Sequence, residues 1–289
     1  MTIADEDRAA LNADQASVDQ GTAAASHTPA SPPGPAAPGA PRRRSPIAVE
    51  LAVIAFLGWV YDWLQNLAPL RAHLALDHAA ALLSFEKGLG IAPELALNHW
   101  LDHEHVLAYI ASDFYDNAIF GVTLGLAAWL WWRRPDIYRP LRNDLVLANV
   151  IGFAVFWVYP LAPPRMLPGF IDVVAQVGGL GSWHQTLMSA ADQFAAMPSM
   201  HLGWAVWCAL VVWRLSRGGG RWRLAAAAFA VTYPLSTALV VMATANHYLL
   251  DVLAGSATTG LSVVLVEVGL PAWQRRRRTD RSAALATRP

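Results

Sequence analysis

The sequence predicts an all-α integral membrane protein, a six-helix bundle with interfacial helices in its first outward loop. Two compositional features favour this class: 55% of the 289 residues are hydrophobic and only 15% are charged, whereas soluble domains usually carry about a quarter charged residues. The apolar residues also form long runs without strict alternation, which favours helices, because an open sheet cannot span lipid. The zero formal net charge gives no support for a nucleic-acid partner.

The two ends of the chain differ in composition from its middle. Residues 1–46 are rich in Ala, Pro, Ser and Gly and bury too little apolar surface to offset the entropy of ordering, so we expect a disordered cytoplasmic tail. Their early acidic residues and the lack of an apolar core argue against a cleaved signal peptide, so the first span should act as an uncleaved anchor. Residues 47–271 form the predicted membrane domain, and 272–289 a basic cytoplasmic tail.

Six segments approach the length of about 20 apolar residues that a bilayer crossing requires. They are residues 47–66, 107–132, 145–161, 200–215, 224–243 and 249–270. Clusters of arginine precede the first segment, separate the second from the third and the fourth from the fifth, and follow the sixth. Basic loops stay on the cytoplasmic side, so both termini are predicted to be cytoplasmic.

Three connections then face outward, at residues 67–106, 162–199 and 244–248. The first is too interrupted to span, and its apolar residues suggest helices along the membrane interface, although a compact loop fits almost as well. These apolar residues are Leu89, Leu95, Leu97 and Trp100.

Nearly all ionisable residues of the membrane domain lie at the outward ends of the spans. At membrane depth each costs about 2.5–3.5 kcal/mol, so each requires a reason. His247 and Asp251 are four residues apart and would share one face of a helix. The carboxylate could accept the imidazole N–H, which would leave the other ring nitrogen as a base or nucleophile.

A second group of outward residues suits an anion. Ser199 follows a proline and stands where a helix N-cap would, with His201 in the first turn, and the free N–H groups there favour negative charge. Arg165 adds a bidentate donor for phosphate oxygens. Together these residues predict a phosphoryl-transfer site without a metal or other cofactor.

Each of these residues also has a structural interpretation. An interfacial histidine often only donates a hydrogen bond, Arg165 could extend to the interface, and His and Asp at helical spacing could bind a metal. Their placement on one side by the independent charge argument favours a single site.

Further polar residues begin the second span. Asp113, Tyr115, Asp116 and Asn117 either bind a polyol headgroup or solvate the start of a helix. The neighbouring His99, His103 and His105 could bind zinc, but a solvated patch is the simpler interpretation. In the last span, Gly255 and Gly260 predict close helix packing.

Three short segments, APPR, PSMH and HYLLD, occur in this order. They resemble the type 2 phosphatidic acid phosphatase superfamily over roughly residues 47–270. With the upstream GIAPELALNHWL, they are similar to the branch of inositol phosphorylceramide synthases and bacterial inositol phosphotransferases.

The resemblance implies a mechanism. His247 would attack the phosphorus and carry a phosphohistidine intermediate, with Asp251 orienting it. His201 would protonate the leaving group and later activate the acceptor, while Arg165 and Ser199 would hold phosphate oxygens.

The chain departs from the family's usual motifs at several positions. Val158 replaces a lysine, Met166 replaces a proline, and Val240 and Val241 replace a Ser-Arg pair. Because two cationic phosphate ligands are missing, we expect a transferase with an extracytoplasmic active site. It would move a phospho-headgroup of the inositol-phosphate type from a phospholipid to a polyol or water. Hydrolysis of lipid phosphates or pyrophosphates is the second interpretation. A non-catalytic transporter is the third, since intramembrane ionisable residues also mark transport routes.

Overall fold

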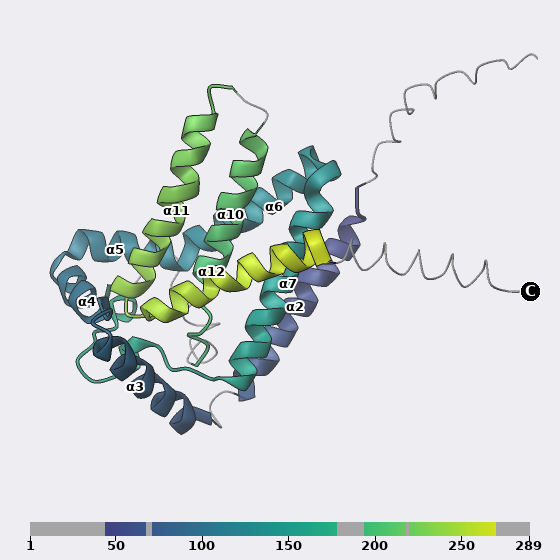
Figure 1. Cartoon of the computed structure of the whole chain (residues 1–289). Helices are drawn as coiled ribbons and strands as arrows, with labels where there is room; N and C mark the ends of the chain where they lie inside the picture. Colours follow the sequence, from purple (N-terminus) through teal and green to yellow (C-terminus); the bar gives the residue numbers. More distant parts are fainter. Residues whose placement is uncertain (1–43, 68–70, 178–193, 218–219, 270–289) are drawn as a thin grey trace, which may run out of the picture. The chain divides into compact units, whose positions relative to one another are not determined.

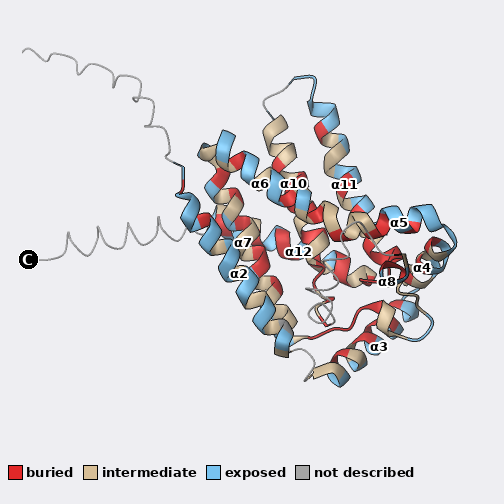
Figure 2. Ribbon diagram, turned by 180° about the vertical axis from the view of Figure 1, so that it is seen from behind, coloured by how far each residue is buried: buried red, intermediate tan, exposed pale blue. Residues whose placement is uncertain are grey.

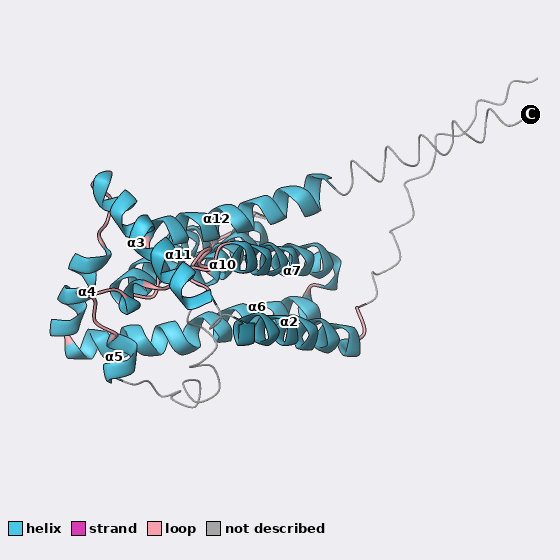
Figure 3. Cartoon of the chain, turned by 90° about the horizontal axis from the view of Figure 1, so that it is seen from below, coloured by secondary structure: helices cyan, strands magenta, loops and turns pink. Residues whose placement is uncertain are grey.

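The computed structural model describes four stretches of the chain, residues 44–67, 71–177, 194–217 and 220–269. Within these stretches the structure is helical, and its only extended pairing is an isolated bridge between Leu161 and Ala195 (Figure 3). The all-α prediction is confirmed for this part of the chain. Residues 1–43 and 270–289, which hold almost all of the predicted tails, lie outside the described residues.

Four described helices are long and apolar enough to cross a bilayer. They are α2 (Ile47–Leu67), α7 (Pro135–Val158), α11 (Arg223–Ala243) and α12 (Leu249–Val264), which the π-helical η4 (Leu265–Gly269) continues. The apolar α10 (Met200–Ser216) is shorter. Each of these helices falls on a predicted span, and the chain is a membrane protein.

The second predicted span is not one continuous α-helix. It consists of α5 (His105–Asp113), a π-helical turn η2 (Phe114–Ala118) and α6 (Ile119–Arg133). A π-turn adds a residue without changing the apolar composition, so hydrophobic periodicity does not reveal it, and such turns are frequent at functional sites. The turn coincides with the polar cluster noted in the sequence.

The third predicted span had incorrect ends. We expected residues 145–161, whereas α7 begins at Pro135 and ends at Val158. Proline at the first helical position has its φ preset for a helix, so the basic segment after it joins the helix. Tyr159 precedes Pro160 and has an extended φ of −129°, as expected for a residue before proline.

The first connection forms two helices, α3 (Ala72–Gly88) and α4 (Glu94–His103). α4 packs on α11, and buried Asn98 secures it, because its amide donates to the carbonyls of Ile171 and Ala243 at 3.0 Å each. The same side chain accepts the Ile171 N–H at 2.8 Å. The connection is therefore folded and packed against the helices, at the end of the bundle where α11 meets α12 (Figure 1).

α10 and α12 cross in close contact. A Cβ atom on buried Gly255 would lie 2.1 Å from the backbone oxygen of Ser199, so only glycine fits there. Next to this contact, the Thr259 hydroxyl donates to the carbonyl of Gly203 at 2.8 Å. Close packing is confirmed at Gly255, but a Cβ on Gly260 would meet nothing within 4 Å, so that part of the prediction is wrong.

Ion pairs join the opposite ends of the helices. Arg142 of α7 lies 2.7 Å from Glu50 near the start of α2. Arg214 near the end of α10 pairs with Glu267 of η4 and lies 3.9 Å from the buried Asp144 of α7. These contacts place the start of α7 beside the start of α2 and the ends of α10 and η4. We call this the basic end of the bundle.

Candidate active site

Four of the predicted residues, among them the two histidines and Arg165, line one cavity of about 420 Å³. Arg165 comes from the 3₁₀ turn η3 (Pro164–Met166), His201 from the first turn of α10, and His247 from the turn before α12. The rings of His201 and His247 are 5.7 Å apart between centroids and inclined at 59°. The structure thus brings together two imidazoles and a guanidinium from distant parts of the sequence.

The position of His201 depends on how α10 begins. Ser199 has an extended ψ of 102°, and its hydroxyl accepts the Leu202 N–H at 3.4 Å, so the predicted N-cap is confirmed. Ser199 itself is fully buried and is not among the residues that line the cavity. It shapes the helix start, while His201, two residues later, reaches the cavity.

The contacts of His247 differ from the prediction. Its Nδ1 lies 2.8 Å from the carbonyl oxygen of Ala196 and 3.7 Å from the nearer carboxylate oxygen of Asp251. A carbonyl can only accept, so Nδ1 carries a proton and Nε2 is the basic nitrogen of the neutral ring. We expected Asp251 to accept this proton, but the Ala196 carbonyl does so.

Asp251 has a different hydrogen bond. Its carboxylate accepts the backbone N–H of Tyr248 at 3.0 Å, as the third residue of a helix does in a capping box. The Asp251 carbonyl accepts the Ser199 N–H at 3.0 Å, so this residue joins the starts of α10 and α12. It fixes the turn that contains His247, and its nearer carboxylate oxygen lies 3.7 Å from Nδ1 of the ring.

Arg165 is held from two sides. Its guanidinium donates to the side-chain oxygen of Asn246 and lies 3.5 Å from Asp172, and its backbone N–H donates to Ala245 at 2.9 Å. Asn246 also lines the cavity, and the sequence reasoning missed it. Its place directly before His247 was a signal that could have identified it.

The predicted headgroup cluster separates in the structure. Tyr115 lines the cavity, and its ring stacks on His201 at 4.3 Å and 17°. Asn117 instead donates to Asp113 at 2.8 Å, and Asp116 is buried. None of these three lines the cavity, so only Tyr115 is brought to the other site residues.

Two further carboxyl groups that the sequence reasoning missed support the site. Glu86 of α3 and Glu94 of α4 are fully buried and accept the N–H groups of Leu250 and Leu249 at 2.7 and 2.6 Å. Helix N-termini leave such N–H groups unpaired and attract negative charge. With Asp251, three carboxyl groups therefore surround the first turn of α12.

Burial governs the protonation of this carboxyl cluster, which consists of Glu86, Glu94 and Asp251. The pKa of Glu86 is raised to about 8, mainly by loss of solvent and also by the neighbouring Glu94 and Asp251 carboxyl groups, against the opposing hydrogen bond from Leu250. Burial also raises the pKa of Glu94. Glu86 is therefore protonated at neutral pH, which limits the negative charge beside His247.

Metal ligands were an open alternative for these residues. In the described part of the chain, no group of three or more His, Cys, Asp or Glu side chains could hold a metal ion. In the group of His99, His103 and His105, the Nε2 atom of His99 contacts the backbone instead, because it lies 2.7 Å from the carbonyl oxygen of Gly169.

The PAP2 superfamily model matches residues 80–265, which include Arg165, His201, His247 and Asp251. The chain belongs to the PAP2 superfamily. It is also 28% identical over 265 residues to a phosphoinositol dihydroceramide synthase of Bacteroides thetaiotaomicron, covering 80% of each chain. No solved structure matches.

Membership of the PAP2 superfamily, together with this relative, makes the protein an enzyme that acts on lipid phosphates. The relative also places it in the branch that resembles inositol phosphosphingolipid synthases. None of the replaced motif positions Val158, Met166, Val240 and Val241 lines the cavity, and Val158 is 74% exposed.

Proposed function

We propose that this PAP2-superfamily enzyme is a transferase that moves an inositol-phosphate type of headgroup from a phospholipid to a hydroxyl acceptor. The observation that carries the proposal is that His201, His247 and Arg165 meet at one end of an apolar cavity. The name of the Bacteroides relative supports phosphoinositol as the group moved and a dihydroceramide-like alcohol as an acceptor.

The proposed reaction has two displacements at phosphorus. Nε2 of His247 forms a bond to phosphorus as the bond to the diacylglycerol oxygen breaks, and His201 gives its proton to that oxygen. The acceptor hydroxyl then loses its proton to His201 and attacks the phosphorus. The phosphorus–nitrogen bond breaks, and both histidines return to their starting states.

The remaining site residues position these groups. The guanidinium of Arg165, held by Asn246, is placed to donate to the phosphate oxygens. Ser199 contributes through the helix start that it caps, where N–H groups favour an anion. Among the predicted headgroup residues, Tyr115 is the one whose position supports contact with the polyol.

We propose six membrane crossings, with η2 interrupting the second, both tails cytoplasmic and the active site extracytoplasmic. Its support is that the contacts of Arg142 and Arg214 lie at the opposite helix ends from His201 and His247, since arginine-rich loops remain in the cytoplasm. In this arrangement, α3 and α4 lie at the outer interface.

The test uses purified protein and phosphatidylinositol labelled in its phosphate, with and without an added alcohol acceptor. We expect label in a new lipid only when the alcohol is present, unaffected by a chelator, and an acid-labile, base-stable phosphoenzyme. His247→Ala should abolish both signals. His103→Ala, which changes an exposed histidine outside the cavity, is the matched control and should retain them.

Other outcomes would select another function. Label retained on His247→Ala would contradict the proposed nucleophile, and loss of activity with a chelator would revive a metal site. Without an alcohol, release of labelled inositol phosphate from phosphatidylinositol, or of free phosphate from labelled phosphatidic acid, would indicate a hydrolase that uses water as the acceptor. No turnover of any lipid phosphate by wild-type protein would leave the non-catalytic transporter as the better description.

A further inference from the structure

The cavity continues from the histidines toward the basic end. Its wall on α2 extends from Tyr61 to Glu50, a separation of eleven residues, or about 17 Å at 1.5 Å per residue. The hydrocarbon core of a bilayer is about 30 Å thick. The cavity therefore reaches about half-way across it, a depth comparable to one leaflet.

Between its polar ends the wall of the cavity is mostly apolar. Representative lining residues are Val53, Leu57, Ile119, Leu124, Leu145 and Phe153. A water-soluble ligand would lose hydration there without compensating hydrogen bonds, whereas a hydrocarbon chain gains from contact with such a surface.

The end of the cavity that lies away from the histidines is polar, but its charged groups are paired with one another. Arg142 lies 2.7 Å from one Glu50 carboxylate oxygen, and the Tyr138 hydroxyl donates to the other at 2.7 Å. All three residues line the cavity. We call Glu50, Tyr138 and Arg142 the floor of the cavity. Their polar groups are paired with one another and gain nothing from a hydrocarbon chain, so they limit how far such a chain extends.

α2 and α6 both line the cavity, and at the floor end the residues just before α2 are hydrogen-bonded to α6. The Trp131 indole donates to the carbonyl of Ser45 at 3.0 Å, and Arg44 donates to that of Trp132 at 2.9 Å. Toward the histidines, α2 instead contacts α7, where Trp63 stacks on Trp157 at 6.0 Å.

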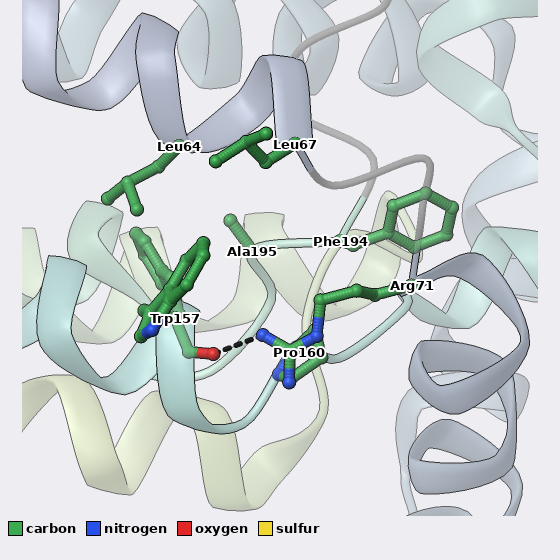
Figure 4. Close-up of a pocket in the computed structure, with 8 residues that line it drawn as sticks. Leu64, Leu67, Arg71, Trp157, Pro160, Phe194 and Ala195 are labelled. Carbon is green, nitrogen blue, oxygen red and sulfur yellow. Dashed lines mark hydrogen bonds between the residues drawn. The ribbon is translucent and has the colours of Figure 1, made fainter.

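The end of α2 continues this one-sided attachment. Leu64 and Leu67 face Trp157 of α7, and Arg71 donates to the Trp157 carbonyl (Figure 4). The described contacts thus attach α2 to α7 along its length, whereas the hydrogen bonds to α6 come from Arg44 and Ser45, just before α2. The walls that α2 and α6 form near the histidines face each other across the cavity.

We infer that the cavity binds a hydrocarbon chain of the lipid substrate, which enters between α2 and α6, and that the floor of Glu50, Tyr138 and Arg142 sets the longest chain accepted. The inference rests on the proposed function for the headgroup end only. There, the histidines would hold the phosphate while the chain occupies the apolar length.

Gly58 provides a test. It lines the cavity on α2, and a Cβ there would meet nothing within 4 Å, so Gly58→Leu should place its side chain in the chain's path without a clash. Gly121→Leu is the matched control, because Gly121 is exposed on α6, away from the cavity, and equally open.

We expect Gly58→Leu to lower the ratio of long-chain to short-chain kcat/KM by about tenfold. That is the factor for losing burial of roughly two methylene groups. Gly121→Leu should leave the ratio unchanged. An unchanged ratio in Gly58→Leu, or an equal fall in both variants, would overturn the inference.

A second measurement does not depend on catalysis. Phosphatidylinositol with a photoreactive group at the end of one chain is bound to His247→Ala protein and illuminated. We expect cross-links in the peptides that contain Glu50 and Tyr138, reduced by Gly58→Leu. Cross-links elsewhere would contradict the proposed cavity, whereas cross-links here without turnover by wild-type protein would fault the proposed function alone.

Discussion

The first turn of α12 and the helix α2 show two ways of fixing a helix in this membrane protein. Two buried carboxyl groups from α3 and α4 accept backbone N–H groups of α12, and a glycine brings α12 against α10. α2 instead has large apolar side chains exposed along its length, including Phe56 and Trp59 (Figure 2). Its contacts with the bundle are few and lie on one side.

The difference corresponds to what each region does in the proposed mechanism. The turn before α12 carries His247, whose ring must keep a fixed relation to His201 and Arg165, and buried hydrogen bonds of fixed geometry provide this. α2 forms a wall that a lipid chain must pass. A helix with few buried contacts opens more easily than one in the core.

The largest effect should come from the crossing of α10 and α12. In Gly255→Val, a new Cβ would lie 2.1 Å from a backbone oxygen, so the helices must separate. Overpacking usually costs 1–3 kcal/mol and occasionally more, and we expect at least about 3 kcal/mol here because no flexible side chain can yield. Thermal unfolding in detergent would measure it.

Gly260→Ala is the control for this prediction. A Cβ at this exposed position meets nothing within 4 Å, and alanine favours a helix by up to about 1 kcal/mol over glycine. The unfolding temperature should stay the same or rise. Equal loss of stability in Gly255→Val and Gly260→Ala would show that the crossing is not a fixed point of the structure.

An intermediate effect should come from the protonation of Glu86. Its pKa is about 8 in the folded protein, against an ordinary value of 4.5, so between these pH values the folded state binds a proton that the unfolded state has lost. Stability from this group therefore falls as pH rises from 4.5 to 8, by at most about 1.4 kcal/mol per pH unit, and is level above 8.

Glu86→Gln isolates this contribution. The amide oxygen can still accept the Leu250 N–H, but the side chain no longer titrates. Between pH 4.5 and 8, the unfolding temperature of the wild type should fall more steeply with pH than that of the variant. Above pH 8 the two unfolding temperatures should depend on pH in the same way. Parallel curves from pH 5 to 8 would mean that Glu86 is ionised in the folded protein.

The smallest effect should come from α2. Trp63 is half exposed and stacks on Trp157 at 6.0 Å, and such aromatic pairs contribute about 0.5–1.5 kcal/mol. Trp63→Ala should therefore change unfolding by no more than this amount. A loss as large as that of Gly255→Val would remove the distinction between a fixed α12 and a weakly attached α2.

The sequence predicted the members of the site better than their contacts. The arginine-rich loops were enough to predict that His201, His247 and Arg165 lie at the same helix ends, because the charge of a loop is a property of local composition. The partner of His247 Nδ1 could not be predicted in this way. It is the backbone carbonyl of Ala196, and backbone groups carry no sequence signal.

Glu86 and Glu94 were missed for a related reason. Acidic residues in a connection between spans are normally solvated, and only the tertiary contact with the first turn of α12 explains their burial. The π-turn at Phe114–Ala118 and the early start of α7 also depend on backbone geometry rather than on apolar periodicity. The apolar runs alone therefore gave the helices but not their interruptions or ends.

The hydrogen bond between His247 and Ala196 has a stereochemical consequence. With Nδ1 bound to a carbonyl oxygen at 2.8 Å, a phosphoramidate on this ring can form only at the opposite nitrogen. The covalent adduct would thus be the tele isomer of phosphohistidine and not the pros isomer. These two regioisomers are distinct chemical species, so the identity of the adduct reports directly on the backbone that holds the ring.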